Sequence, residues 1–577
     1  MEQALDLPEI LAGIGQYLTA KDILSCMRVR KSWKVEFGPL LWRTFTSRPY
    51  IKNDPASPPQ PSLALLRENA PNVRRLVIEY MNPAYQASFF CQCRQLEEIV
   101  LANPRHVGNY RYESHEVFLW SSLAAAIKDH PRLRKFVIEP SLEIEYAPTS
   151  RFISALNTCS KLIVLETAEC VFDCNLVVPY LQTISNNIRR FLTQQDIYEP
   201  FKFPDDLVFQ EMRYLDLRDI VMPVSQQLTW ISRCPNLISL YWRSQDEFPG
   251  EEFCQKIPQA CRNLTSLHLL FNLEDEEIAS VLKAFPRLEK LSFTHTDFDT
   301  EAFAALKRHF PTLKDINLQY CGGVESHMVQ EILASCSNLQ SISADELGQE
   351  DMVKQPWVCR NLQMIDVGIC VDARGGKTET LERHRQVYER LAQMTELQYL
   401  SICNNDGMPD YGPSFSLLKL SMDAGLGRLD MLKKLKVFSC KQALGESLAD
   451  RQAIEAVQWM VDHWKRLEVV EGALDSSMFD TTHDTTKDGE TVQGLLKARG
   501  IKFLDFIAAM EQRDAIFGDA YDSYFDDDYG LFEGDMFGLT DLDEDEDFDD
   551  DYDYDQDYSG PELEQATDDE DEWIDED

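Results

Sequence analysis

One spacing of apolar residues recurs along most of this chain and limits what it can fold into. In the segment RNLTSLHLLFN, Leu264 is followed by leucines at +3 and +5 and by an asparagine at +8. Seven successive steps from Leu162 to Leu339 measure 26, 24, 25, 27, 24, 25 and 26 residues. We call the first residue of each frame its anchor. The anchors are Val73, Leu96, Leu133, Leu162, Ile188, Met212, Leu237, Leu264, Leu288, Leu313, Leu339, Leu362, Leu397, Leu432 and Leu467.

The frame predicts a short strand followed by a helix. Side chains alternate along a strand, so residues at +3 and +5 share one face and those at +2, +4 and +6 the other. Segments 275–285 and 300–310 then show a helical apolar stripe, with Thr300 placed to cap. Such a period is typical of a leucine-rich repeat, whose units bury their apolar faces only when stacked. We predict an α/β leucine-rich-repeat solenoid, or horseshoe, with a strand-lined concave side.

Ten of the 15 cysteines keep a fixed place in the frame, as they do in cysteine-containing leucine-rich repeats, which the spacing resembles. Six stand three residues before an anchor: Cys93, Cys159, Cys234, Cys261, Cys336 and Cys359. Four stand eight residues after one: Cys170, Cys321, Cys370 and Cys440. We interpret them as buried, reduced thiols. Because the start MEQALDLPE lacks the features of a signal peptide, we expect a cytoplasmic or nuclear protein.

Residues 5–45 predict three short amphipathic helices ahead of the repeats. Pro8 suits the first turn of a helix, and Thr19 with Asp22 forms a capping pair. About 40 residues make a small core, so part of this apolar surface is expected to meet a partner.

The same segment resembles an F-box. The residues that carry the resemblance are Leu7-Pro8-Glu9-Ile10-Leu11, Ile14, Leu18, Asp22-Ile23, Val29, Lys31, Trp33 and Leu41-Trp42. The resemblance, to fungal-type F-box and leucine-rich-repeat proteins, implies docking on the Skp1-like adaptor of a cullin-based ubiquitin ligase. The residues that it implies for adaptor binding are Leu7, Pro8, Ile10, Leu11, Ile14, Leu18 and Ile23. It assigns Val29, Trp33 and Trp42 to the internal core. The alternative is a helical cap on the solenoid.

Composition divides the chain into four parts. The net charge is −42, yet residues 519–577 hold 29 acidic residues and no lysine or arginine. Neither residues 519–577 nor the rest of the chain has the basic stripe of a nucleic-acid-binding protein. No apolar run is long enough to span a membrane. The predicted parts are residues 1–47, an F-box-like helical module; 48–62, a proline-rich linker; 63–517, repeats with a C-terminal cap; and 518–577, a disordered acidic tail.

The sequence offers no pattern for catalysis, so we predict a protein that is not an enzyme and has no cofactor. The segment Arg374–Thr378 (RGGKT) resembles a phosphate-binding loop, but Val371 stands where that loop needs glycine. Histidines and cysteines lack metal-ligand spacing, and no G-x-S-x-G motif occurs.

The concave face is the informative surface for binding. The +2, +4 and +6 positions bring tyrosine and arginine together, residues enriched at binding hot spots. Trp242, at +5, is expected to point inward. The predicted client-binding residues are Arg218, Tyr241, Arg243, His268 and Lys290. The chain's own acidic tail is an alternative occupant of this patch.

Two functional hypotheses remain. The first is a non-catalytic substrate-recognition subunit of an SCF-type ubiquitin ligase. It would bind the adaptor, and through it a cullin, by the F-box and an unidentified protein client by the repeats, and be monomeric apart from that complex. The second is a leucine-rich-repeat scaffold outside the ubiquitin system, whose acidic tail binds basic proteins.

Overall fold

The computed structural model covers the whole chain and describes part of it. The described residues are 7–15, 17–47, 63–78, 92–101, 124, 127–128, 130, 132–138, 150–156, 158–167, 181–194, 204, 206–218, 222–244, 247–402, 415–440, 451–471 and 492–504. The chain divides into two units, Met1–Ala509 and Met510–Asp577, and all described residues belong to the first. The predicted linker 48–62, the tail 518–577 and Cys170 lie outside the described residues.

The strands of the described residues form one sheet. They are β1 (Thr44–Ser47), β2 (Arg75–Ile78), β3 (Glu98–Leu101), β4 (Lys135–Ile138), β5 (Val164–Thr167), β6 (Arg190–Gln194), β7 (Tyr214–Arg218), β8 (Ser239–Arg243), β9 (Ser266–Leu270), β10 (Lys290–Phe293), β11 (Asp315–Leu318), β12 (Ser341–Gly348), β13 (Met364–Asp372), β14 (Tyr399–Ser401), β15 (Phe415–Leu417), β16 (Val437–Ser439), β17 (Val469–Glu471) and β18 (Lys502–Leu504). Neighbours in the chain pair in parallel, except that β15 pairs antiparallel with β13 and β14 pairs directly with β16.

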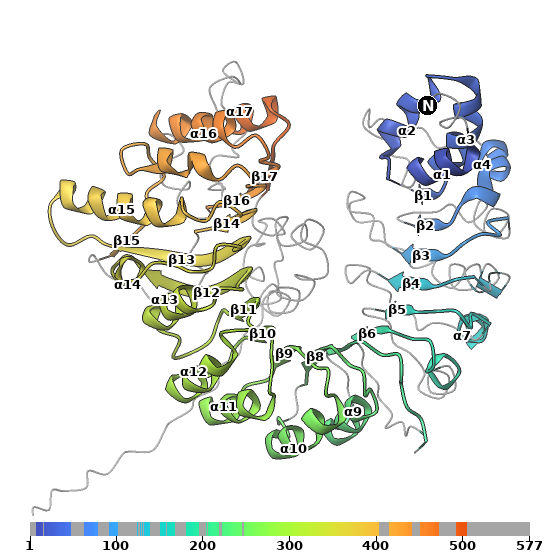
Figure 1. Cartoon of the computed structure of the whole chain (residues 1–577), viewed down its shortest axis with the longest axis horizontal. Helices are drawn as coiled ribbons and strands as arrows, with labels where there is room; N and C mark the ends of the chain where they lie inside the picture. Colours follow the sequence, from blue (N-terminus) through green and yellow to red (C-terminus); the bar gives the residue numbers. More distant parts are fainter. Residues whose placement is uncertain are drawn as a thin grey trace, which may run out of the picture. The chain divides into compact units, whose positions relative to one another are not determined.

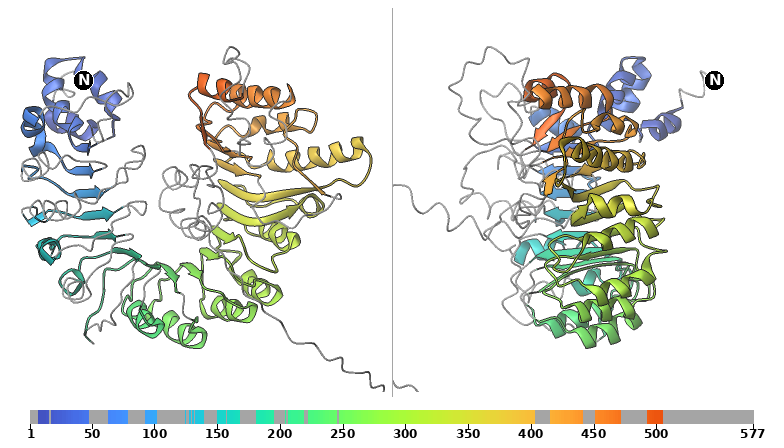
Figure 2. Two further views of the ribbon diagram at one scale, coloured as in Figure 1. Left: turned by 180° about the vertical axis from the view of Figure 1, so that it is seen from behind. Right: turned by 90° about the vertical axis from the view of Figure 1, so that its left-hand side faces the viewer.

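Helices follow the strands along one side of this sheet (Figures 1 and 2). The described helices are α1 (Pro8–Gly15), α2 (Ala20–Met27), α3 (Lys31–Leu41), α4 (Leu63–Asn69), η2 (Ala70–Asn72), α7 (Ser150–Leu156), α9 (Val224–Ser232), α10 (Gly250–Ala260), α11 (Asp275–Ala284), α12 (Thr300–Leu306), η3 (Lys307–His309), α13 (Ser326–Ser335), α14 (Gln349–Lys354), α15 (Lys377–Leu391), η5 (Leu426–Met431), α16 (Arg451–His463) and α17 (Val492–Ala498). Their order gives the predicted α/β architecture, a solenoid-like stack on a long parallel sheet.

The repeated frame sets both the core and the pairing of the strands. Leu267 and Leu269, at +3 and +5, are fully buried between sheet and helices. The N–H groups of Thr265 and Ser266 both donate to the carbonyl of Ile238, at 3.0 Å each. Because the corresponding positions of most neighbouring coils make the same pair of bonds, the register passes from one coil to the next.

Cysteines and asparagines beside the anchors join one coil to the next. The Cys261 thiol donates to the carbonyls of Ile231 (3.3 Å) and Cys234 (3.4 Å), and burial raises its pKa to about 12. The asparagine just before an anchor bonds the preceding coil, as Asn187 does to the carbonyl of Ser160 at 2.6 Å. The analogous bonds are made by Asn236, Asn263 and Asn338. This asparagine position was visible in the sequence and was missed.

Two expectations from the frame were wrong. Strand β16 pairs Val437 with Tyr399, so its anchor is Leu435 and not Leu432. Leu432 instead takes the place three residues earlier, where other coils have cysteine, and Cys440 stands at +5. Thr300 is also not a cap, because it is the first helical residue. The carboxylate of Asp275, in the preceding coil, accepts the N–H groups that begin α12.

The longer late steps of the frame carry extra structure. Strand β13 extends to Asp372, where its second half pairs with β15, and the long helix α15 follows. At the far end, α17 is followed by Gly500 and then by β18, and Gly500 adopts a φ of 70° that favours glycine. At the near end, β1 pairs with β2, so the sheet begins before the proline-rich segment.

Candidate interaction surfaces

The N-terminal module has a small core of its own. Leu11, Ile23 and Phe37 are buried together, and partly buried apolar residues of α2 and α3, with Leu18 between α1 and α2, pack on them. The predicted capping pair is present: Thr19 Oγ1 accepts the N–H of Asp22, and Asp22 Oδ2 accepts the N–H of Thr19, both at 3.3 Å. This capping box fixes the turn between α1 and α2 and thereby the position of α1.

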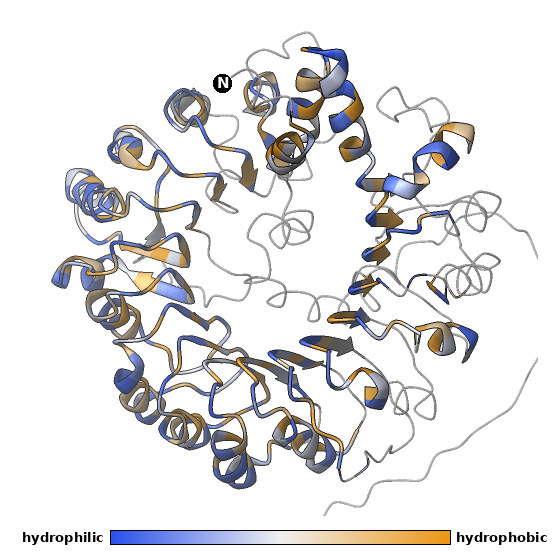
Figure 3. Cartoon of the chain, turned by 45° about the vertical axis from the view of Figure 1, so that its right-hand side comes forward, coloured by the Kyte–Doolittle hydropathy of each residue, from blue (hydrophilic) through white to orange (hydrophobic). Residues whose placement is uncertain are grey.

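One stripe of α1 faces solvent although it is apolar. The exposed fractions are 49% for Leu7, 39% for Ile10, 39% for Ile14 and 89% for Tyr17. These residues follow one another at intervals of three or four, which places them on one side of a helix and its continuation. Exposed apolar stripes of this kind are typical of surfaces that contact another protein. Figure 3 shows hydrophobic and hydrophilic residues side by side on the helices, the module included.

The structure sorts the residues predicted to bind the adaptor. Leu7, Pro8, Ile10 and Ile14 are exposed, and Leu18 is half-buried. Leu11 and Ile23 were placed wrongly on this surface, because they are 1% and 5% exposed in the module's own core. Val29 was placed wrongly in the core and is 60% exposed. The exposed apolar residues that sequence reasoning missed are Tyr17, Leu24 and Val35.

A second set of side chains stacks across strands β6 to β9 on the face opposite the helices. The Arg190 guanidinium lies 4.3 Å from the Tyr214 ring centroid, and the Arg218 guanidinium lies 5.1 Å from that of Tyr241. Tyr241 in turn stacks on His268, with 4.7 Å between centroids and 18° between planes. We call these five residues the strand-face ladder; they lie on four successive strands, at the +2, +4 and +6 positions of the frame.

Three of the five ladder residues are buried, which corrects the prediction of an exposed client-binding patch, while Arg190 and Tyr214 are half-buried. Arg218 and Tyr241 are each 1% exposed and His268 is 7% exposed. Arg218 Nε donates to Asp216 Oδ1 at 3.2 Å, so a neighbouring carboxylate balances its charge. Burial, assisted by Lys290 and Arg218, lowers the pKa of His268 to about 3, so its ring is neutral at physiological pH. The ladder therefore supports the sheet.

Arg243 and Lys290, the other two predicted client-binding residues, do not share this burial. Arg243 ends β8 and is half-buried, while the Lys290 side chain at the start of β10 is 39% exposed and lies 3.9 Å from Asp315. Trp242 points inward as predicted: it is fully buried, and its Nε1 donates to Gln227 Oε1 at 2.6 Å.

The later strands carry carboxylates on the same face, and two of them, Asp366 and Glu471, were missed by sequence reasoning. Asp315, Asp366 and Glu471 occupy +2 or +4 positions and are buried. Burial raises the pKa of Asp315 to about 6, against the opposing effects of Lys290 and Ser341. The frame places these residues, and reading the same positions beyond β11 would have found Asp366 and Glu471.

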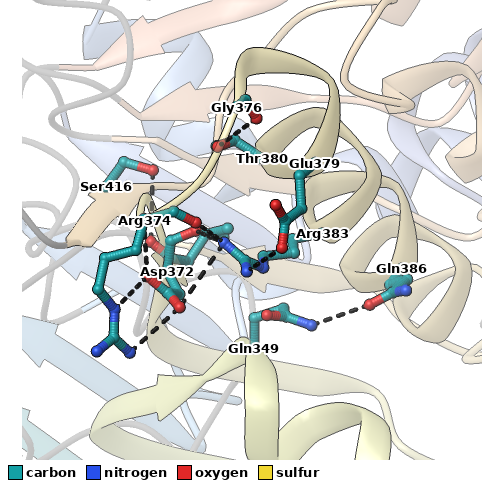
Figure 4. Close-up of polar contacts among 10 residues, drawn as sticks. Gln349, Asp372, Arg374, Gly376, Glu379, Thr380, Arg383, Gln386 and Ser416 are labelled. Atoms are coloured by element: carbon teal, nitrogen blue, oxygen red, sulfur yellow. Dashed lines mark hydrogen bonds and ion pairs between the residues drawn. The ribbon is translucent and has the colours of Figure 1, made fainter.

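The glycine-rich segment after β13 is a structural loop, as predicted. Asp372 Oδ1 accepts both the N–H and the Nε of Arg374, at 2.8 and 2.9 Å (Figure 4). Arg383, reaching back from α15, donates to the carbonyl of Asp372 at 2.9 Å and to Glu379 at 2.7 Å. Gly375 has a φ of 119°, and an added Cβ would lie 2.6 Å from the Glu379 carboxylate. The chain's own side chains therefore hold the loop from both sides.

Within the described residues, no helix is long and apolar enough to cross a membrane, and no group of three histidine, cysteine, aspartate or glutamate residues could hold a metal ion.

Comparison with known proteins gives distant similarities. No family model and no curated protein matches the sequence. A chain of the yeast Rad7–Elc1 complex is similar in structure at 9% identity, over 74% of this chain and 88% of that chain, with a TM-score of 0.37. A chain of the Drosophila Toll–Spatzle complex is similar at 13% identity, over 75% and 50%, with a TM-score of 0.28. At these TM-scores neither similarity assigns a partner or an activity.

Proposed function

We propose that this chain is a non-catalytic substrate receptor of a cullin-based ubiquitin ligase. In this proposal residues 7–42 are an F-box that docks on a Skp1-like adaptor, and the coils are leucine-rich repeats that hold a protein client. Catalysis would then come from proximity, because the client is held near a ubiquitin carrier that the ligase supplies.

The exposed apolar stripe of α1 carries the proposal. A module this small needs most of its apolar residues for its own core. Yet only Leu11 of this stretch is buried in that core, while Leu7, Ile10 and Ile14 face solvent. The stripe coincides with the residues that carry the F-box resemblance. A helix presenting anchors at i, i+3 and i+7 suits a hydrophobic groove on a partner.

The connection between the module and the coils also supports the proposal. Strand β1 follows α3 directly, and its four residues pair with β2 in register, Thr44 with Arg75 through Ser47 with Ile78. The side chain of Trp42, between α3 and β1, packs against the core of the coils. The module and the coils therefore share one hydrogen-bonded sheet, which would hold a bound client at a defined distance from the adaptor.

The test is binding of the full-length chain to a purified Skp1-like adaptor, measured by co-purification and calorimetry. The double variant Ile10→Asp/Ile14→Asp should weaken binding by about 30-fold or more, the loss of one hot spot of about 2 kcal/mol. The control is Met431→Asp, which places one such charge at an apolar residue 57% exposed on the coils. Its affinity should equal that of the unchanged chain.

Both variants should keep the thermal midpoint of the unchanged chain, because the altered side chains are exposed. Adaptor binding that survives Ile10→Asp/Ile14→Asp would remove the F-box assignment. If the adaptor does not bind at all and basic proteins are captured through residues 519–577, the scaffold hypothesis replaces it.

A further inference from the structure

At the end of strands β10 and β11, two aromatic residues occupy an unusual backbone conformation. His295 has a φ of 56° and Tyr320 a φ of 58°, and they are the non-glycine residues with positive φ in the described part of the chain. Each lies seven residues after its anchor, so the two are equivalent positions of adjacent coils. Non-glycine residues in the left-handed region are strained by about 1–3 kcal/mol, and such residues cluster at functional sites.

Because His295 and Tyr320 share this conformation, their rings lie face to face; we call the pair the aromatic platform. The rings stack with 4.9 Å between centroids and 2° between planes. His295 is exposed and Tyr320 is half-buried, in contrast to the ladder pair Tyr241 and His268, which is buried. An exposed pair of parallel rings offers a π face to a ligand.

Two carboxylates stand beside the platform. Asp345 accepts the N–H of Tyr320 with both oxygens, at 3.0 and 2.9 Å. Asp297 bridges to Gly322, two residues beyond Tyr320, and its Oδ1 would lie 2.9 Å from a Cβ added there. Both carboxylates contribute to the raised pKa of Cys321, between Tyr320 and Gly322, after the larger effect of burial. The edge of the sheet at this point is therefore aromatic and negatively charged.

Strand β10 adds hydroxyl groups that lack partners. Ser292 and Thr294, the strand-face residues that lead into His295, are 0% and 5% exposed. Their Oγ and Oγ1 atoms have no hydrogen-bond partner among the described residues. A buried hydroxyl without a partner is unfavourable by about 1–3 kcal/mol, so uncompensated polar burial accompanies the strained turn at His295.

We propose that this edge of the sheet binds an arginine side chain of a partner protein. A guanidinium stacks on aromatic rings and pairs with carboxylates through N–H donors that lie in one plane, which matches the rings of His295 and Tyr320 and the carboxylates of Asp297 and Asp345. A lysine would supply the charge without the planar stack. The chain's own residues 519–577 contain no lysine or arginine and do not fit as occupant.

This inference deepens the client-binding half of the proposed function by naming the chemistry of the client. Its test needs no adaptor, so failure here leaves adaptor binding untouched, and loss of adaptor binding leaves this site testable.

The experiment uses the full-length chain and a photo-crosslinking nonapeptide with three arginines among glycine and serine. The matched probe carries citrulline, which keeps the shape of arginine and removes its charge. Crosslinks are located by mass spectrometry, so that capture by the acidic residues 519–577 is counted separately. We expect arginine-dependent crosslinks within residues 290–350, and about tenfold fewer with citrulline.

The deciding variants separate the effect of losing the Tyr320 ring from the effect of changing the backbone turn. Tyr320→Asn removes the ring, yet asparagine adopts left-handed backbone more readily than tyrosine, so the turn is kept. It should lower the affinity of the site about tenfold without lowering the thermal midpoint, while Tyr320→Phe keeps the affinity. His463→Asn is the control, because His463 stacks on Trp459 in the same way on helix α16. Crosslinks confined to residues 519–577, or unchanged in Tyr320→Asn, would overturn the proposal.

Discussion

Arg218 and Asp216 form an ion pair inside the strand face, with 3.2 Å between Nε and Oδ1 and neither residue more than 1% exposed. The two side chains belong to one strand, two residues apart, and therefore point to the same face. Arg218, which the sequence predicts as a binding residue, therefore pairs with the carboxylate of its own neighbour Asp216. Its guanidinium plane then rests on Tyr241, which joins β7 to β8.

Breaking this pair should destabilise the chain strongly. Asp216→Asn leaves the Arg218 charge buried without its carboxylate, and such losses lower the free energy of unfolding by about 3–5 kcal/mol. The measurement is the urea midpoint of the full-length chain followed by circular dichroism. The control is Glu252→Gln, which removes an exposed partner of Lys256 and should change the free energy by about 0–1 kcal/mol. Equal midpoints for the two variants would contradict the structural role given to the ladder.

How far the sequence predicted the surfaces depends on what a periodic frame contains. The frame gives the face on which a side chain lies, and Trp242 and the +2 and +4 residues were placed on their correct faces. The frame does not say whether a residue on the strand face is exposed. Exposure there depends on neighbours, such as Asp216 on the same strand as Arg218 and His268 on the coil next to Tyr241. Arg218, Tyr241 and His268 were therefore grouped correctly and given the wrong exposure.

The same limit explains the helical module. Pattern alone shows that Leu11 and Ile14 are both apolar, and a helix of eight residues has too few turns to separate its buried side from its exposed side. Only the packing of Ile23 and Phe37 against Leu11 decides between them. The shift from Leu432 to Leu435 has a comparable cause. Leu432 fits the sequence frame better, with Val437 at +5 and Cys440 at +8, and only the pairing of Val437 with Tyr399 shows that Leu435 is the anchor.

The buried Asp315 predicts a pH dependence of stability. Burial raises its folded-state pKa to about 6, above the value of about 3.8 for an unperturbed aspartate, with Lys290 and Ser341 opposing the shift. The folded chain therefore binds this proton more tightly than the unfolded chain. Its contribution favours folding fully below about pH 4 and is lost as the pH rises through 6.

Asp315→Asn should accordingly stabilise the chain at pH 8 by up to about 3 kcal/mol and have little effect at pH 4. Urea midpoints at pH 4, 6 and 8 for both proteins give the comparison. The difference between variant and unchanged chain should grow across pH 4 to 6 and level off above. A difference that stays constant with pH would show that the carboxyl of Asp315 is ionised in the folded chain throughout this range.

The cap that Asp275 supplies to the next coil gives the last prediction. Its Oδ1 accepts the N–H groups of Asp299 (2.8 Å) and Ala302 (2.9 Å), and its Oδ2 accepts that of Glu301 (2.9 Å). A carboxylate at this place satisfies N–H groups that the first turn of α12 leaves open and interacts favourably with the positive end of the helix dipole. Asp275→Ala should lower the free energy of unfolding by about 1–2 kcal/mol. Asp299→Ala is the matched control, since Asp299 stands at the N-cap position of α12 but makes no capping hydrogen bond with its side chain. Hydrogen exchange should show faster exchange at the amides of Asp299, Glu301 and Ala302 in Asp275→Ala alone. If Asp299→Ala is the more damaging of the two, the cap belongs to the helix's own coil and the link between coils through Asp275 is refuted.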